Sequence, residues 1–214
     1  MWGGWAVELG RRLDGATRRP VAGDVFAALG FDPSSGRVLP EAPLAIGTMA
    51  GIREIVAAVI RRWCPNVGAA RRAVDDAWFE PDPATAVPTT DLPALFGWLR
   101  SSGRQIALAT TDDRGPTEAT LRALEVREMV SALACGDDGG GVKPDPAMLL
   151  AICTACGVVP VRTAVVGDTP ADLEMGRNAG AGLVVGVLSG LGDADGLGRV
   201  ADLVLASVAD LRPD

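Results

Sequence analysis

The chain has 214 residues, of which 48% are hydrophobic, and its formal net charge at pH 7 is −7. This length suffices for one large domain or for a core with a smaller lobe, and the apolar content favours a packed core over disorder. The acidic balance argues against a nucleic-acid or anionic-membrane surface, because such surfaces need clustered lysine and arginine. We therefore expect neither nucleic acid nor membrane as a partner.

The first 90 residues predict helices and no strand. Apolar residues recur every three or four positions in the ranges 2–13, 21–29, 49–63 and 67–79, a spacing typical of amphipathic helices. Clusters of Gly, Pro and Ser separate these ranges, and the proline-rich stretch EPDPATAVPTTDLP ends the pattern. We expect residues 1–90 to form a helical domain.

From residue 91 onward, helical patterns alternate with short apolar strands. Asp91 is expected to cap a helix over 91–101, because its carboxylate can accept hydrogen bonds from the first turn. Strands are expected at 105–110, 129–136, 162–168, 181–187 and 201–207, with helices at 117–126, 145–156 and 170–179 between them. This alternation predicts an α/β domain over residues 91–214, a three-layer Rossmann-like parallel sheet with helices on both faces.

The sequence indicates neither a membrane span nor a signal peptide. A helix needs about 20 successive apolar residues to cross a bilayer, and no run of that length occurs. Glu8, Arg11 and Arg12 interrupt the apolar residues near the start, unlike the core of a signal peptide. The expected location is the cytoplasm.

The types of ionisable residue in the chain limit the catalytic mechanisms and metal sites that it can have. It contains no histidine, which excludes Ser-His-Asp and Cys-His nucleophile systems. Its one lysine, Lys143, lies in the glycine-rich turn GGGVKPDP. Two interpretations are open: a function requires a compact ammonium group at this position, or the lysine occurs in the loop by chance. Cys153 and Cys156 form a C-x-x-C without a second such pair, so we expect them to pack in a helix rather than to bind zinc.

Polar side chains follow three of the predicted strands at their carboxyl ends, where ligands bind in open α/β sheets. Thr110 and Thr111 end the first strand, Lys143 comes after the second, and Asp168 ends the third, with Asp172 in the next turn. Such a set suits a metal-bridged phosphate, with Thr110 and Lys143 on the phosphate and Asp168 on Mg²⁺. Asp172 is placed to bond Lys143 or a metal-bound water.

The same residues have simpler structural interpretations. Asp168 could cap the helix that begins at Pro170, and Asp172 could be a first-turn acid favoured by the helix dipole. Thr110 could be an ordinary residue at a strand end. The order of the set, Thr, then Lys, then G-D-x-x-x-D, favours the phosphate site over these alternatives.

Three stretches resemble signature motifs of a known family. ALATTDD, GVKPDPAMLL and VVGDTPADLEMGRNAGAG are similar to the second, third and fourth motifs of the haloacid dehalogenase-like (HAD) hydrolases. The group that they resemble most is the phosphoglycolate-phosphatase-like one, whose members carry a helical cap. The resemblance covers residues 91–214, and the helical range 1–90 is similar to the cap in size and character.

This resemblance implies a Mg²⁺-dependent phosphatase that acts on a small phosphorylated metabolite, such as a phosphoglycolate-like phosphomonoester. It implies that Thr110, with Thr111 beside it, binds the phosphoryl group and that Lys143 stabilises it. Asp168 would ligate Mg²⁺, and Asp172 would support both the metal site and catalysis. The paired acids favour a metal-dependent phosphatase over a metal-free dehalogenase.

The family's first motif, an apolar strand that ends in D-x-D-G-T and carries the nucleophilic aspartate, is absent. The nearest string, RRLDGAT at 11–17, has Arg12 at the nucleophile position and follows a helical pattern. The chain therefore lacks an obvious covalent nucleophile. It also lacks the family's first central strand, which lies between the strands expected at 105–110 and 162–168, and each buried backbone group left unpaired costs about 1–3 kcal/mol.

Three hypotheses remain for such a chain. In the first, Met1 is not the natural start, and the missing strand and nucleophile lie just upstream. In the second, the chain is a non-catalytic HAD-like pseudo-enzyme or phosphate-binding module. The third, a receiver-type signalling domain, fits less well, because its acid pair and phosphoacceptor precede the Thr and Lys, whereas here the Gly-Asp acid comes last.

Overall fold

The computed structural model describes residues 2–211. Met1 and residues 212–214, and with them the expectation about the start of the chain, lie outside the described residues. Contacts within the chain divide it into two compact units, Met1–Thr85 and Ala86–Asp214. The boundary expected after residue 90 lies a few residues further on, in the segment before the first helix of the second unit.

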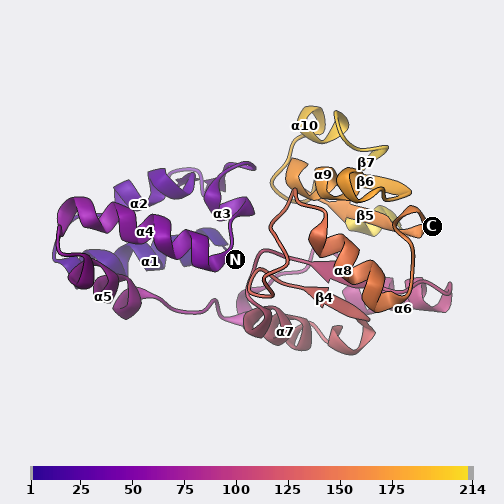
Figure 1. Ribbon diagram of the computed structural model, residues 1–214, viewed down its shortest axis with the longest axis horizontal. Coiled ribbons are helices and arrows are strands. Elements are labelled where there is room, and N and C mark those ends of the chain that lie inside the picture. The colour runs from indigo at the N-terminus through magenta and orange to yellow at the C-terminus, as the bar shows by residue number, and fades with distance from the viewer. Residues whose placement is uncertain (1, 212–214) are drawn as a thin grey trace. The chain divides into compact units, whose positions relative to one another are not determined.

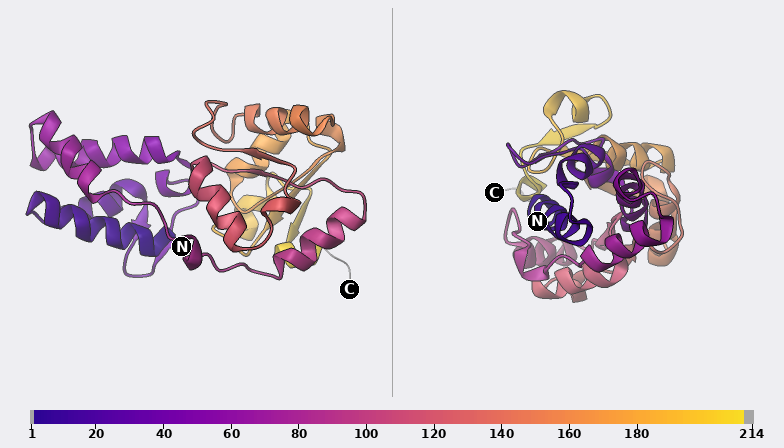
Figure 2. Two further views of the ribbon diagram at one scale, coloured as in Figure 1. Left: turned by 90° about the horizontal axis from the view of Figure 1, so that it is seen from below. Right: turned by 90° about the vertical axis from the view of Figure 1, so that its left-hand side faces the viewer.

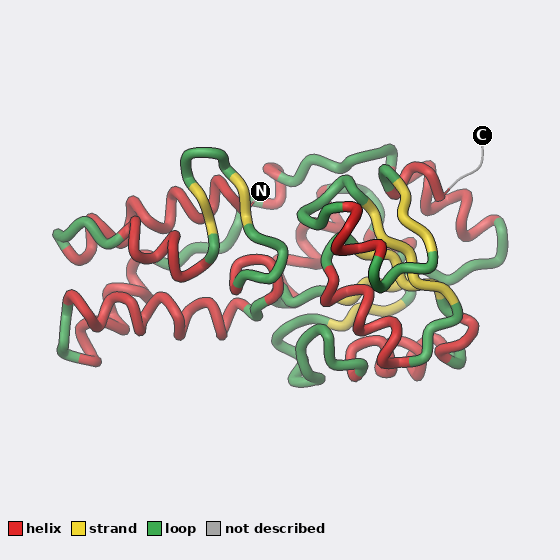
Figure 3. Tube along the Cα trace, turned by 90° about the horizontal axis from the view of Figure 1, so that it is seen from above, coloured by secondary structure: helices red, strands yellow, loops and turns green. Residues whose placement is uncertain are grey.

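The first unit is built mainly from helices, as Figure 1 shows. They are α1 (Trp2–Thr17), α2 (Ala22–Leu29), α3 (Pro43–Ile46), α4 (Met49–Trp63) and α5 (Val67–Ala77), followed by the 3₁₀ helix η1 (Pro83–Thr85). The sequence missed a small antiparallel hairpin of β1 (Phe31–Asp32) and β2 (Arg37–Val38), drawn as a yellow pair in Figure 3. Strands of two residues are too short to show an alternating pattern.

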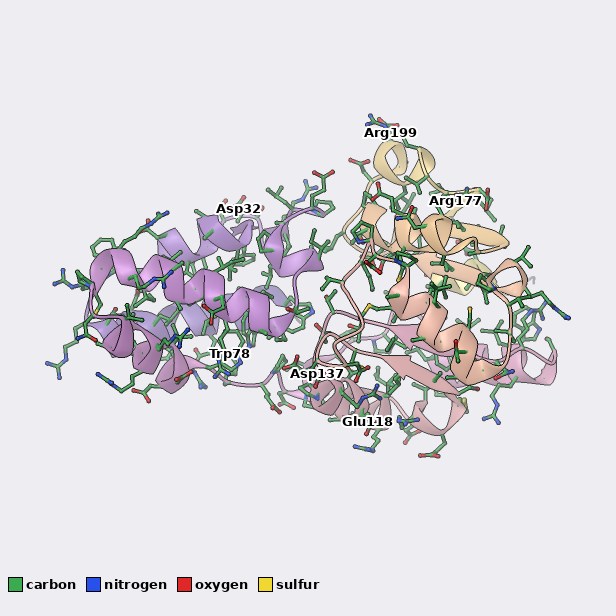
Figure 4. The ribbon with its side chains drawn as sticks, in the orientation of Figure 1. Asp32, Trp78, Glu118, Asp137, Arg177 and Arg199 are labelled. Atoms are coloured by element: carbon green, nitrogen blue, oxygen red, sulfur yellow. The ribbon has the colours of Figure 1, made fainter. Side chains whose placement is uncertain are left out.

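The core of the first unit gathers the apolar faces of its helices. Leu9 and Leu13 of α1, with Val56 and Ile60 of α4, are fully buried there. A group of aromatic rings packs with this core, and the Trp5 indole donates to the Phe79 carbonyl at 3.0 Å. Trp78, labelled in Figure 4, packs edge-on against Trp5.

The string RRLDGAT lies on α1, so the helical interpretation of this stretch is confirmed. The Asp14 carboxylate accepts hydrogen bonds from the N–H groups of Val21 and Ala22, at 2.7 and 2.9 Å. It therefore holds the turn between α1 and α2. This use of its oxygens gives Asp14 a structural role within the first unit.

The second unit alternates helices and strands, as expected. Its elements are α6 (Leu92–Ser101), β3 (Ala107–Ala109), α7 (Arg114–Ala123), η2 (Arg127–Met129), β4 (Ala132–Ala134), α8 (Ala147–Cys156), η3 (Pro160–Arg162), β5 (Ala164–Gly167), α9 (Pro170–Ala179), β6 (Leu183–Val187), α10 (Ala194–Gly198), β7 (Leu203–Leu205) and η4 (Val208–Leu211). Asp91 caps α6 through a hydrogen bond from Ala94 N–H, which confirms the expected cap. At the beginning of α7, Asp137 accepts from the N–H of Arg114 (Figure 4).

The strands of the second unit form two parallel sheets instead of one. β3 pairs with β4, and β5 pairs with β6, which pairs with β7. Within residues 2–211 no ladder joins β3 to β5. The family's first central strand was expected between these two, and the sheet has not closed up in its absence.

Helices cover both faces of these sheets. Ala132 and Ala134 of β4 belong to a buried cluster with α8, whereas Leu133 belongs to another with Phe96 of α6 and Leu121 of α7. Successive side chains of a strand point to opposite faces, so α8 and α6 lie on opposite sides, as Figure 2 shows. The predicted three-layer architecture is thereby confirmed.

Helix α8 spans the two sheets. Its residues Met148 and Ile152 share one buried cluster with Ala134 of β4 and Val165 of β5. Cys153 of the C-x-x-C is buried in the same cluster, and Cys156 packs at its margin. The expected packing role of these cysteines is confirmed, and α8 packs against both sheets.

Candidate active site

Lys143 and Asp172 come together although 29 positions separate them. The Lys143 ammonium donates to Oδ1 of Asp172 at 2.7 Å, and only 14% and 13% of the two side chains are exposed. The loop after β4 is thus tied to the first turn of α9. Of the two partners proposed for Asp172 from the sequence, Lys143 is the one that it contacts.

The cap of α9 is Thr169, and Asp168 does not cap the helix. The Thr169 hydroxyl donates to Oδ2 of Asp172 at 2.7 Å, and the Thr169 N–H donates to the same oxygen at 3.1 Å. The Thr169 oxygen in turn accepts from the Asp172 N–H, which completes a capping box. Both oxygens of Asp172 are therefore engaged by protein groups, and Asp168 is free for another role.

The loop after β6 surrounds Asp168. Its Oδ2 accepts from the Leu191 N–H, and its carbonyl accepts from the Gly192 N–H, both at 2.8 Å. A Cβ at Gly190 would stand 1.9 Å from the same Oδ2, so only glycine allows the loop to approach this closely. Among the described residues, no hydrogen bond reaches Oδ1 of Asp168, which leaves that oxygen available to a ligand.

Thr110 lies just past the carboxyl end of β3. Its N–H donates to the Ala134 carbonyl, and its hydroxyl oxygen accepts from the Asp112 N–H at 3.1 Å. The hydroxyl also bonds the Asp112 side chain, which lowers the pKa of that carboxyl in part. Thr111, the other predicted phosphate contact, is buried with 8% of its surface exposed.

Two residues outside the predicted set of site residues also bear on the site. Asn178 on α9 donates from its amide to the Pro144 carbonyl at 2.9 Å, a second tie between α9 and the lysine loop. The positive charge of Lys143 acts on the Asp112 carboxyl and lowers its pKa. The sequence offered a signal for each residue. Asn178 lies in the GRNAG string, and Asp112 directly follows the two threonines.

Two hydrogen bonds and one electrostatic interaction connect the carboxyl ends of β3 and β5. Thr110 forms a hydrogen bond with Asp112, and the positive charge of Lys143 lowers the pKa of the Asp112 carboxyl. Lys143 in turn binds Asp172 in the turn after β5. The sequence had led us to expect this convergence for Thr110, Lys143, Asp168 and Asp172. The roles of these residues in binding and catalysis stay predictions.

The protonation of Asp112 gives a testable consequence. Burial raises its pKa, while the bond to Thr110 and the Lys143 charge lower it in part. Above the raised pKa of the folded state, the ionised Asp112 therefore destabilises the fold. This loss of stability vanishes below the pKa of the unfolded state, about 4, because Asp112 is then protonated in the folded and the unfolded chain alike. We expect Asp112→Asn to raise the free energy of unfolding in urea at pH 7 and to leave it unchanged at about pH 3.

The matched control is Asp195→Asn on α10, where the carboxylate is exposed. This control should change the free energy of unfolding little at either pH. Equal gains for both variants at pH 7 would contradict the assignment of the effect to burial of Asp112.

The oxygen donors at β5 fit Mg²⁺ in part. This ion prefers oxygen ligands and keeps several waters, and proteins often hold it with one or two carboxylates and a substrate phosphate. The free Oδ1 of Asp168 fits one such position, whereas Asp172 already accepts three hydrogen bonds. In the described part of the chain no group of three or more His, Cys, Asp or Glu residues could hold a metal ion. Asp168 thus fits as one ligand of an ion that is otherwise held by water and phosphate.

Comparisons with known proteins agree with the fold. Among curated proteins, the phosphoglycolate phosphatase of Rhodospirillum rubrum is 34% identical over 110 residues, which cover 51% of this chain and 46% of that protein. The N-acetylmuramic acid 6-phosphate phosphatase of Pseudomonas aeruginosa is 30% identical over 132 residues, 61% of this chain and 58% of that one. The chain thus spans about half the length of the curated relatives it matches.

Solved structures resemble the chain over most of its length. A predicted phosphoglycolate phosphatase from Haemophilus somnus matches with a TM-score of 0.65 at 15% identity, over 96% of this chain and 89% of that one. A HAD family hydrolase from Deinococcus radiodurans with bound phosphate and sodium matches with a TM-score of 0.59 at 21% identity, over 95% and 87%. At such identities the likeness shows the fold.

The family is settled by a match over most of the sequence. Residues 16–180 match the model of the haloacid dehalogenase-like hydrolases. That range contains all the residues of the candidate site, from Thr110 to Asp172. The chain belongs to the haloacid dehalogenase-like hydrolases.

Proposed function

We propose that this chain carries the phosphate- and metal-binding part of a Mg²⁺-dependent phosphatase that acts on a small phosphorylated metabolite, such as a phosphoglycolate-like phosphomonoester. The observation that supports this most is the Lys143–Asp172 pair, which holds an ammonium group at the first turn of α9, just after the carboxyl end of β5. The names of the curated relatives, phosphoglycolate phosphatase and N-acetylmuramic acid 6-phosphate phosphatase, fit such a substrate class. A cytoplasmic location stays a prediction.

Each residue has a role that its contacts allow. Lys143 uses one of its three N–H donors on Asp172, so two remain for phosphate oxygens. When phosphate binds, Thr110 turns its hydroxyl hydrogen from the Asp112 carboxyl to the phosphate, and Thr111 borders that position. Asp172 positions Lys143, and Asp168 offers one oxygen to Mg²⁺, which when bound supplies positive charge that neutralises the phosphate.

A second candidate function is a phosphate-binding module without catalysis. It is favoured by one observation: in residues 2–211, the aspartate nearest to a first motif, Asp14, is used to hold a turn of the first unit. In this case the chain binds phosphate at the same site but has no covalent nucleophile. Both candidate functions predict that the chain binds phosphate, and only the first predicts hydrolysis of a phosphomonoester.

Calorimetric titration of the chain with inorganic phosphate, with and without Mg²⁺, tests both. We expect phosphate to bind more tightly with Mg²⁺, and Asp168→Asn to remove the Mg²⁺ effect. The control Glu174→Gln, an exposed position on α9, should keep it. A screen of small phosphomonoesters then separates the candidates, since release of phosphate supports the enzyme and binding without release supports the module. Absence of phosphate binding in Mg²⁺ would contradict both.

In the part of the chain from Trp2 to Leu211, no helix is long and apolar enough to cross a lipid bilayer.

A further inference from the structure

Arginines without an acidic partner gather at one end of the first unit. The turn between α1 and α2 and the turn between α4 and α5 lie at this same end (Figure 1). The indole N–H of Trp63, the last residue of α4, donates to Asp24 in the first turn of α2 at 2.9 Å and joins the two turns. We call this surface the arginine end, after the five arginines in or beside the two turns: Arg18, Arg19, Arg61, Arg62 and Arg72.

The contacts of these five residues set them apart. All five are exposed, and within residues 2–211 none of their side chains forms an ion pair, a hydrogen bond or a cation–π contact. The acidic residues beside the turns, Asp14 and Asp24, accept instead from backbone N–H groups and from Trp63. Four other arginines of the same helices do pair with carboxylates: Arg11 and Arg12 with Glu8, Arg53 with Asp75, and Arg71 with Glu54.

Helix stability explains only part of this arrangement. Arg61 and Arg62 lie in the last turn of α4, where the helix dipole favours cations. A Cβ at Gly68 would stand 3.4 Å from Nη1 of Arg72, so this guanidinium reaches back to the N-terminal turn of α5, where the dipole disfavours a cation. Arg18 has a φ of 54°, in the left-handed region that favours glycine. Arg72 and Arg18 therefore occupy positions in which an arginine does not stabilise the fold.

Apolar surface lies among these cations. Val67, the first residue of α5, is 52% exposed, and the ring of Trp63 is only partly buried. Arginine and tryptophan are enriched where proteins bind proteins, and the planar fork of arginine binds a carboxylate through two parallel hydrogen bonds. A nucleic acid would meet a chain whose net charge is −7 and would gain little from Val67. The arginine end therefore fits an acidic peptide better than a nucleic acid.

We propose that the arginine end binds an acidic segment of a partner protein. Carboxylates of that segment pair with the free guanidinium groups, and an apolar side chain of the segment packs on Val67 and Trp63. Clusters of arginine bind acidic motifs in this way. The proposal does not rest on the proposed function, since every residue of the arginine end belongs to the first unit.

The probe is an acetylated and amidated peptide of about eight residues, mostly glutamate, with leucines at its centre. In calorimetry we expect it to bind the full chain, and to bind more weakly as salt is added, because exposed charges are screened. A peptide with glutamine in place of every glutamate should bind at least about tenfold more weakly. No binding of the glutamate peptide, or equal binding of the two peptides, would overturn the proposal.

A matched pair of double variants locates the binding. Arg61→Gln with Arg62→Gln should weaken binding of the glutamate peptide about tenfold. Arg37→Gln with Arg199→Gln removes the same charge from two exposed arginines outside the arginine end, of which Figure 4 labels Arg199. This control should leave the binding unchanged, and an equal loss in both double variants would show that the peptide responds to net charge alone.

Arg18→Gly separates binding from folding. Glycine adopts a φ of 54° without strain, so this variant should keep or raise the melting temperature while it weakens binding of the peptide. Unchanged binding would contradict the place of Arg18 in this surface.

Two further measurements decide the kind of partner. Single-stranded DNA of about eight nucleotides should bind more weakly than the glutamate peptide, and equal or tighter binding would overturn the choice of a protein partner. Sedimentation of the chain alone should show no association that depends on these arginines. If Arg61→Gln with Arg62→Gln abolishes an association of the chain with itself, the arginine end binds a second copy, and the separate partner is overturned.

Discussion

Replacing Lys143 by methionine is expected to lower the free energy of unfolding of the chain by about 1–3 kcal/mol, less than the ~3–5 kcal/mol for breaking a fully buried pair. The change leaves the Asp172 carboxylate, of which 13% is exposed, without its cation. Methionine keeps most of the apolar stem, so the loss reflects charge more than packing. Urea unfolding followed by circular dichroism measures it.

A double-mutant cycle isolates the pair. Asp172→Asn removes the charge but keeps an oxygen for Thr169, so it should cost less than Lys143→Met. The double variant should be more stable than the sum of the two losses predicts, because no unpaired charge is left. Additive losses would mean that the 2.7 Å contact contributes nothing of its own. Under the proposed function, Lys143→Met also abolishes phosphate binding, which calorimetry measures separately.

Replacing Gly167 by alanine is expected to destabilise the second unit by about 1–3 kcal/mol, the usual cost of overpacking a buried position. A Cβ at Gly167 would lie 2.2 Å from the Cβ of Asp172, a distance that forces β5 and α9 apart. Because Asp172 would move with the first turn of α9, the variant should also lose the contact to Lys143. Thermal unfolding measures the first effect, and phosphate titration measures the second.

The control is Gly97→Ala on α6. A Cβ there meets no atom within 4 Å, so alanine should be neutral or stabilise the helix by about 1 kcal/mol. A loss at Gly97 as large as the loss at Gly167 would show that the effect is not due to the close approach of Asp172.

The sequence predicted the layers of the second unit because its signals are local. Apolar runs of strand length between amphipathic helices identify parallel strands without any tertiary information, and Asp91 is recognisable as a cap from its neighbours. The proximity of Lys143 and Asp172 could also be predicted from the sequence, since parallel strands bring their carboxyl ends to one edge of a sheet. The hairpin of the first unit was missed because two-residue strands carry no period.

The details of the site depend on contacts that no local pattern contains. The interpretation of Asp168 as a helix cap was wrong: Thr169 takes the cap through a reciprocal bond with Asp172, and a loop from beyond β6 encloses Asp168 instead. The amide bond of Asn178 to the lysine loop joins residues 34 apart. The separation of the sheets between β3 and β5 followed from the absent first motif, because a missing strand removes partners from both of its neighbours.

Helix α8 has a consequence for the cooperativity of the second unit. Within the described residues, the sheet of β3 and β4 and the sheet of β5, β6 and β7 share no ladder, so much of their coupling runs through the apolar face of α8. Regions joined by few contacts open as separate units in native-state hydrogen exchange. We expect the amides of β3 and β4 to exchange through a lower-energy opening than those of β6, whose strand has neighbours on both edges. The packing of α8, together with the bonds from the loop after β4 to α9, therefore affects whether the second unit unfolds in one step or in two.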